Sequence, residues 1–205
     1  MRRTTVAAVA VAALVGVGAG AAVTAYDGSD GHRPMASAGW HDGHQGIGPG
    51  SGMGRGMGQH ASVASEKEFL AEMVAHHQEA IRAARELARS DRADLRDFGE
   101  RIVADQSAQV DRMEGWLDDW YADGAGDVDY EPMMRDLSGL TGDRLDRTFL
   151  EDMVWHHMAA VMMAQHLLVS GLVEHDEVAA LARDIRDDQR AEIRQMRRWL
   201  ADWFA

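Results

Sequence analysis

The chain has 205 residues, with 21 Lys and Arg against 34 Asp and Glu, so its formal net charge at pH 7 is −13. This acidity argues against nucleic acid as a partner, because phosphate binding needs a concentrated basic face, and it is compatible with attracting cations. The sequence has no cysteine, which excludes disulfides, thiolate metal sites and cysteine nucleophiles. Any metal must therefore be held by His, Met, carboxylate or amide groups, and the sequence offers 13 methionines and 10 histidines.

Residues 1–25 are typical of an export signal. Arg2 and Arg3 precede an apolar run at residues 6–23, and Ala25 ends a small-residue site for cleavage. The run is at the lower limit of length for a membrane span and is rich in Ala and Gly, so we favour a cleaved signal peptide over a single retained membrane anchor. Both outcomes predict an exported, extracytoplasmic protein that is secreted or held at the cell surface.

Residues 26–64 are predicted to form a flexible linker, because a Gly-rich segment with almost no large aliphatic residue cannot bury enough surface to fold. The segment also contains several histidines and methionines: His32, His41, His44, His60, Met35, Met53 and Met57. Two interpretations stay open, since such a segment is either a plain spacer or a tail that collects metal ions.

The remaining part, residues 65–205, is predicted to be an all-α domain with four long helices. A capping box at Ser65 opens the first helix, and Ser90 or Asp91 is expected to cap the second. The first expected helix runs from residue 66 to about 89, and the second runs from its cap at 90 or 91 to about 121. The third runs from about 143–146 to 171, and the fourth from about 176 to 204. Pro132 is suited to a first helical turn and predicts a short additional helix between the second and third.

This domain contains an internal repeat. Residues 69–80 read FLAEMVAHHQEA and residues 149–160 read FLEDMVWHHMAA, and residues 102–120 match residues 185–203 in the same way. Each half is therefore a helical hairpin, and two hairpins can bury each other's apolar stripes as a four-helix bundle. The two repeats span residues 66–121 and 146–204.

The repeated motif predicts a metal site inside the bundle. At helical spacing, each motif places one methionine and two adjacent histidines on the stripe that faces the core. The expected ligands are Met73, His76, His77, Met153, His156, His157, Met113 and Met196, with Gln106, Gln189 and Glu192 orienting the imidazoles. Mixed His and Met ligation without cysteine favours Cu(I), with Ag(I) as its mimic, and zinc or Cu(II) bound through histidine is the next candidate. Because histidine must be neutral to bind a metal, binding is expected to weaken below about pH 6.

A structural interpretation competes with the metal site. Buried imidazoles and amides need hydrogen-bond partners, and the same Gln and Glu side chains, together with backbone carbonyls, could supply them without a metal. Two facing Met-x-x-His-His sets favour the metal. An enzyme is not expected, because the histidines lack the Glu-x-x-His spacing of di-iron sites and the domain lacks a serine nucleophile motif.

The second motif carries an outer face that the first lacks. Trp155, Met158, Met162 and His166 lie at helical spacing opposite the histidine pair, whereas the equivalent positions of the first helix are ordinary solvated residues. This face is either a packing surface, for the 122–145 connection, a protein partner or a second subunit, or an accessory Cu(I) site formed by Met158, Met162 and His166.

The motifs resemble those of the domain of unknown function 305 (DUF305) family. The matching segments are Met73-Val-Ala-His76-His77 and Met153-Val-Trp-His156-His157, each after Phe-Leu, and the Gln…Met-x-x-Trp-Leu pattern of the helices that follow. The resemblance covers about residues 65–204. It implies a ferritin-like four-helix bundle in an exported bacterial protein, and some relatives are associated with copper binding and copper tolerance.

Overall fold

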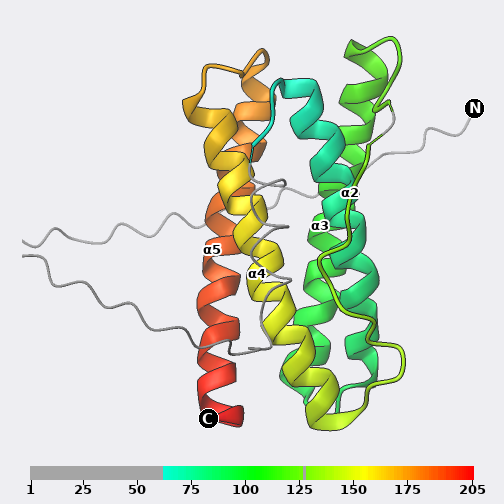
Figure 1. Ribbon diagram of the computed structural model, residues 1–205, viewed down its shortest axis with the longest axis vertical. Helices are drawn as coiled ribbons and strands as arrows, with labels where there is room; N and C mark the ends of the chain where they lie inside the picture. The colour runs from blue at the N-terminus through cyan, green and yellow to red at the C-terminus, as the bar shows by residue number, and fades with distance from the viewer. Residues whose placement is uncertain (1–61, 127) are drawn as a thin grey trace, which may run out of the picture. The chain divides into compact units, whose positions relative to one another are not determined.

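The described part of the chain is all-α, with four long helices packed as two hairpins (Figure 1). The computed structural model describes residues 62–126 and 128–205, so the predicted signal segment and the predicted linker up to residue 61 lie outside it. The helices are α2 (Glu66–Arg85), α3 (Ala93–Trp120), α4 (Gly142–Val169) and α5 (Asp176–Phe204), and a short 3-10 helix, η1 (Glu86–Arg89), follows α2. Within this part of the chain, no helix is apolar enough over a sufficient length to cross a membrane.

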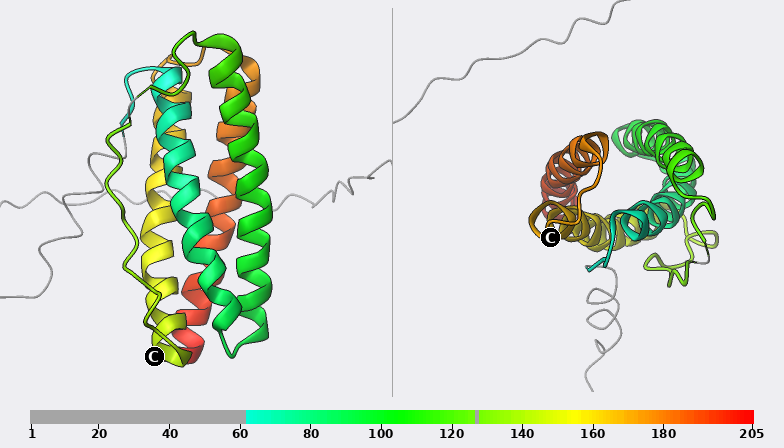
Figure 2. Two further views of the ribbon diagram at one scale, coloured as in Figure 1. Left: turned by 90° about the vertical axis from the view of Figure 1, so that its right-hand side faces the viewer. Right: turned by 90° about the horizontal axis from the view of Figure 1, so that it is seen from above.

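The order of the helices around the bundle follows from the duplication. α2 packs along α3, α4 packs along α5, and α2 also packs against α4 to join the two hairpins. Seen end-on, the order around the bundle is α3, α2, α4 and α5, so α3 and α5 face each other across the remaining side (Figure 2). The two hairpins predicted from the repeat are confirmed.

The helix ends largely follow local sequence signals. Ser65 is the N-cap of α2, and its hydroxyl accepts the backbone N–H of Glu68, as the capping box predicts. The prediction for α3 is wrong, because its N-cap is Arg92 rather than Ser90 or Asp91. The Ser90 hydroxyl instead accepts the N–H of Arg92 and stabilises the turn that precedes the helix.

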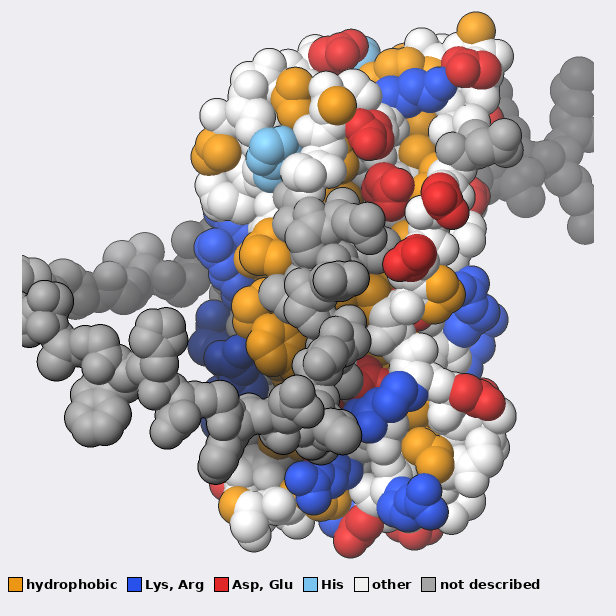
Figure 3. Space-filling model, viewed as in Figure 1, with side chains coloured by type: hydrophobic (Ala, Val, Ile, Leu, Met, Phe, Trp, Pro, Cys, Tyr) orange, Lys and Arg blue, Asp and Glu red, His pale blue; other side chains and the backbone are white. Residues whose placement is uncertain are grey.

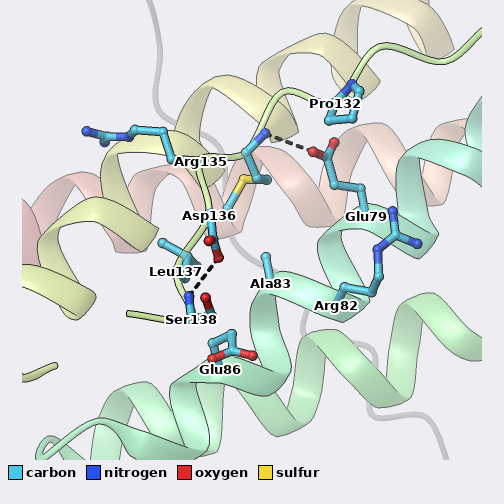
Figure 4. A pocket seen from close by; sticks show the side chains of 10 residues that line it. Glu79, Arg82, Ala83, Glu86, Pro132, Arg135, Asp136, Leu137 and Ser138 are labelled. Carbon is cyan, nitrogen blue, oxygen red and sulfur yellow. Dashed lines mark hydrogen bonds between the residues drawn. The ribbon is translucent and has the colours of Figure 1, made fainter. Parts of the chain in front are cut away.

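The short helix predicted at Pro132 does not form. The backbone N–H groups of Met133 and Met134 each donate to the carboxylate of Glu79, at 2.8 Å, and the N–H of Arg135 donates to Asp152 at 3.0 Å. Figure 4 shows the Glu79 side chain directed at the connection beside Pro132. These amides bond to buried carboxylates of α2 and α4, and the connection runs down the outside of the bundle beside these helices in a non-helical conformation (Figure 2).

The apolar core has two packing clusters that reflect the repeat. Phe69, Met73 and Met113 belong to one cluster, and their equivalents belong to the other: Phe149, Met153 and Met196. All six side chains are fully buried. Equivalent apolar residues of the two repeats are therefore buried in the same way in both hairpins. The histidine pairs lie near the middle of α2 and α4.

Candidate metal centre

Four imidazoles lie inside the bundle where α2 packs against α4. His76, His77, His156 and His157 are all 0% exposed. The rings of His76 and His156 lie against each other, with 3.6 Å between their centroids and 34° between their planes. Within each pair the centroids are 6.1 Å and 6.2 Å apart. The two repeated motifs therefore face each other, as the helical spacing predicted.

The second histidine of each pair bonds to the other helix of its own hairpin. His77 Nε2 lies 2.7 Å from Oε1 of Gln109, and His157 Nε2 lies 2.6 Å from Oε2 of Glu192. An ionised carboxylate can only accept, so Nε2 of His157 carries a proton, which leaves Nδ1 as the nitrogen that can offer a lone pair. The amide oxygen of Gln109 fixes the same tautomer in His77.

The first histidine of each pair is held differently. His76 Nε2 donates to the backbone carbonyl of His156 at 3.1 Å, which again places the lone pair of the neutral ring on Nδ1. His156 Nε2 lies 3.2 Å from Oε2 of Glu79, a carboxylate that is itself only 5% exposed. The residue equivalent to Glu79 in α4 is Ala159, whose side chain offers no polar atom. The two inner histidines therefore have unequal surroundings.

Several buried polar atoms of this layer have no hydrogen-bond partner among residues 62–126 and 128–205. They are Nδ1 of His76, His77 and His157 and Oε1 of Gln106 and Gln189. All belong to residues that the sequence predicted as ligands or as orienting groups. Because leaving a polar atom buried without a partner costs roughly 1–3 kcal/mol, this set needs a further partner, which a metal ion or ordered water would supply. The unpaired imidazole nitrogens are thus of the kind that a metal ion would bind.

Burial favours the neutral form of His76 and His77. It lowers the pKa of His77 from 6.5 to about 4, even though the hydrogen bond to Gln109 acts in the opposite direction. Burial, followed by the neighbouring His156, lowers the pKa of His76 well below its ordinary value. The weakening of binding predicted below about pH 6 stays a prediction, and for His77 the lowered pKa moves its expected onset towards pH 4.

Thioether ligands are available in the same core. The four buried methionines predicted as ligands are Met73, Met113, Met153 and Met196. Thioether sulfur is a soft donor that suits Cu(I). Across residues 62–126 and 128–205, no group of three or more His, Asp or Glu side chains lies close enough together to hold a metal ion.

Comparison with known proteins places the chain in a family. The sequence profile described as domain of unknown function (DUF305) matches residues 66–200. The chain belongs to the DUF305 family. A comparison with curated proteins finds no match.

Several solved structures share this fold. CopM in its Cu(I)-bound form is 29% identical, with a TM-score of 0.62, over 70% of this chain and 100% of that chain. CopM has also been solved in a Cu(II)-bound form and in Ag-bound forms. A DUF305 fragment from Deinococcus radiodurans is 31% identical over 69% of this chain and 98% of that chain, with a TM-score of 0.56.

A further relative bears on location. A DUF305 protein from Streptomyces coelicolor, which has been proposed to be secreted, is 28% identical over 67% of this chain and 93% of that chain, with a TM-score of 0.61. The names of these relatives describe metal-bound forms or the domain itself, and none names a catalytic activity.

The outer face of α4 in this DUF305 protein is partly covered. Trp155 is 44% exposed, whereas Met158, Met162 and His166 are half-buried. Figure 3 shows hydrophobic side chains on this side of the bundle. His166 Nε2 lies 3.0 Å from the carbonyl of Val63, which precedes α2. Met158 also packs against the core cluster that contains Met153.

Two features of the histidine layer were not predicted. The imidazole of His77 bonds to Gln109, whereas Oε1 of Gln106, the residue that was given an orienting role, has no hydrogen-bond partner within the described residues. Glu79 was missed altogether. Its position three residues after His76 puts both side chains on one helical face, and this spacing is the signal that could have found it.

Proposed function

We propose that this DUF305 protein binds Cu(I), or Ag(I) in its place, in the core of the bundle, and sequesters or carries the ion outside the cytoplasm. The observation that carries the proposal is the hydrogen-bonding pattern of the buried imidazoles. Three of them use Nε2 for a hydrogen bond and leave the Nδ1 lone pair without a partner in the described residues. The ligands are drawn from His76, His77, His156, His157, Met73, Met113, Met153 and Met196.

This pattern is what a metal-binding histidine requires. A ligating imidazole almost always donates its other N–H to a carboxylate, amide or carbonyl, which fixes the tautomer and the orientation of the ring. His157 has a carboxylate in Glu192, His77 has an amide in Gln109, and His76 has a backbone carbonyl. Imidazole together with thioether sulfur favours a soft monovalent ion, and zinc or Cu(II) would rely on the imidazoles alone.

The structural alternative accounts for the layer less completely. Hydrogen bonds between histidines and their neighbours satisfy one nitrogen of His76, His77 and His157, but Nδ1 of each ring and the Oε1 atoms of two glutamines are left over. A purely structural polar layer is expected to satisfy its buried atoms. The metal-bound forms of CopM also support ion binding in a related bundle.

Two further parts of the proposal concern other regions. Residues 1–25 act as an export signal and residues 26–64 as a linker before the bundle at 65–205, and the linker either spaces the bundle or collects ions. The outer face of α4 is a secondary site through Met158, Met162 and His166, or it receives a protein partner or a second copy beside Trp155.

The test is a competition titration of the mature chain with Cu(I) and a chromogenic chelator. Replacement of His76, His77, His156 and His157 by Ala is expected to weaken binding by about 100-fold or more, because removal of orienting groups alone costs about 10–100-fold. The matched control is His166→Gln with His175→Gln, which removes imidazoles outside the core and is expected to lower the number of bound ions by one at most.

Circular dichroism checks that the core variant keeps its helices, and His77→Asn with His157→Asn provides a milder variant if it does not. Unchanged Cu(I) affinity in a folded core variant would rule out the proposed site. An unchanged number of bound ions in the control would assign the outer face of α4 to packing.

A further inference from the structure

A groove separates the two second helices of the hairpins. It lies between α3 and α5 and has a volume of about 450 Å³. Its lining includes Asp105, Gln109 and Arg112 from α3 and Asp188 and Glu192 from α5. This is the side of the bundle that α2 and α4 do not cover (Figure 2).

The groove reaches the buried histidine layer through two side chains. Gln109 and Glu192 line it, and the same two side chains hydrogen-bond to Nε2 of His77 and His157. Both imidazoles are 0% exposed, and their Nδ1 atoms have no partner within the described residues. The Glu192 side chain is 24% exposed, so it contacts both the groove and the buried imidazole of His157. One side chain therefore separates the floor of the groove from each of these imidazoles.

The groove carries an excess of negative charge. Asp105, Asp188 and Glu192 contribute carboxylates, alongside the guanidinium of Arg112. Partial burial, followed by the surrounding carboxylates, raises the pKa of Asp188, and Glu192 and Asp105 of the groove are among those carboxylates. A concave surface lined by one sign of charge concentrates counter-ions and accelerates their binding.

We propose that this groove is the route by which a soft monovalent cation enters the bundle, and that Glu192 passes the ion to His157. The inference rests on the proposed function, since it assumes that the core histidines bind the ion. The carboxylates of Asp105 and Asp188 capture the cation at the mouth, and Glu192 binds it next. Because Nε2 of His157 bonds to Glu192, Nδ1 lies on the far side of the ring. The ion therefore moves from Glu192 past the edge of the imidazole before it exchanges the carboxylate for the Nδ1 lone pair, and no proton is transferred because Nε2 keeps its hydrogen.

The two hairpins contribute unequally to this route. Gln109 occupies the position that Glu192 has in the other hairpin, and its neutral amide holds His77 without attracting a cation. The route therefore delivers the ion first to His157, and His77 receives it afterwards inside the core.

The experiment measures the rate of Ag(I) uptake by the metal-free mature chain. Protein is mixed with silver nitrate, quenched with excess chelator after increasing delays, and bound silver is counted by native mass spectrometry. Glu192→Gln, and separately Asp105→Asn with Asp188→Asn, are expected to lower the association rate by about 10-fold or more and to weaken its dependence on ionic strength. The equilibrium affinity is expected to change much less than the rate. The control is Glu177→Gln, which removes the same charge from an exposed position in the first turn of α5.

The outcomes separate the two proposals. If the unmodified chain binds no silver, the proposed function fails. If it binds silver through the core histidines but the groove variants take it up as fast as the Glu177→Gln control, the route is wrong. A Glu192→Gln variant that binds at the normal rate and releases silver faster would also overturn the route, because Glu192 would then act only by orienting His157.

Discussion

The two hairpins bury the same set of core residues, but the side chains that bond to their histidines differ in charge. Phe, Met and the two histidines repeat in α2 and α4, and both copies are fully buried. The partner of the second histidine, however, is the neutral Gln109 in one hairpin and the anionic Glu192 in the other. The duplication therefore preserved the packing and the imidazoles, while the charged groups around them diverged. Any difference in how the two hairpins bind a cation is therefore expected to come from those charged groups.

A similar contrast separates the two ends of the bundle. At one end, the fully buried carboxylate of Glu66 accepts the backbone N–H groups of Glu174 and His175, at 2.6 Å and 3.0 Å, and the Nδ1–H of His175 at 2.6 Å. The hydroxyl of Tyr121 donates to the same carboxylate at 3.3 Å. The His175 ring also stacks on Trp120, with 3.8 Å between centroids. One buried acid thus joins α2, α3 and the start of α5.

The equivalent positions at the other end are Asp146, Arg92 and Trp203. Asp146 is fully buried and accepts one bond from Arg92, at 2.6 Å, and Arg92 lies 5.0 Å from the Trp203 ring. Arg92 also donates to the exposed Asp143 at 2.8 Å. The arrangement of acid, cation and indole is retained, but this acid accepts fewer bonds than Glu66.

The largest predicted effect is a difference in stability between these two ends. Glu66→Gln removes a charge that several donors share and leaves buried backbone N–H groups poorly paired, so it is expected to cost about 3 kcal/mol. Asp146→Asn is expected to cost about 1 kcal/mol, because Arg92 keeps its bond to Asp143. Urea unfolding at neutral pH with unchanged m-values measures both. Equal losses, or a larger loss for Asp146→Asn, would contradict the comparison.

A second effect is expected in the pH dependence of stability. The pKa of His77 is 6.5 in the unfolded chain and about 4 in the folded protein, so only the unfolded chain gains this proton as the pH falls between those values. The contribution to stability is fully present above pH 6.5 and is lost towards pH 4, by an amount on the order of a few kcal/mol. Gln109→Glu gives His77 a carboxylate like that of His157, which is expected to raise its pKa and flatten this dependence.

Urea unfolding between pH 4.5 and pH 7.5 measures the slope for the two proteins. Gln165→Glu on α4 is the control, because it adds the same charge outside this hydrogen bond. A slope that Gln109→Glu leaves unchanged would show that the pairing of His77 with a neutral partner does not set its pKa.

Local patterns predicted most of the fold. Helical periodicity predicted the four helices and the face that carries the histidine pairs. Ser65 predicted the start of α2, because its hydroxyl accepts the backbone N–H of Glu68, only three residues further along the chain. The repeat indicated that two hairpins would pack together. These features depend on residues that are close in sequence, or on a pattern that occurs in both repeats.

The errors concern contacts between residues far apart in the chain. Pro132 does not begin a helix because Glu79 and Asp152, on two other helices, accept the backbone N–H groups of the connection. The choice of Gln109 over Gln106 depends on the relative level of α2 and α3, which periodicity does not fix. The low pKa of His77 arises from complete burial, a property of the assembled bundle.

The most direct test of the central claim is the ¹⁵N NMR spectrum of the histidine side chains, recorded before and after addition of Ag(I). We expect Nε2 of His76, His77 and His157 to carry a proton, and we expect silver to shift their Nδ1 resonances while the Nε2–H signals persist. Silver that binds through Nε2, or that leaves all the core imidazole signals unchanged, would contradict the account.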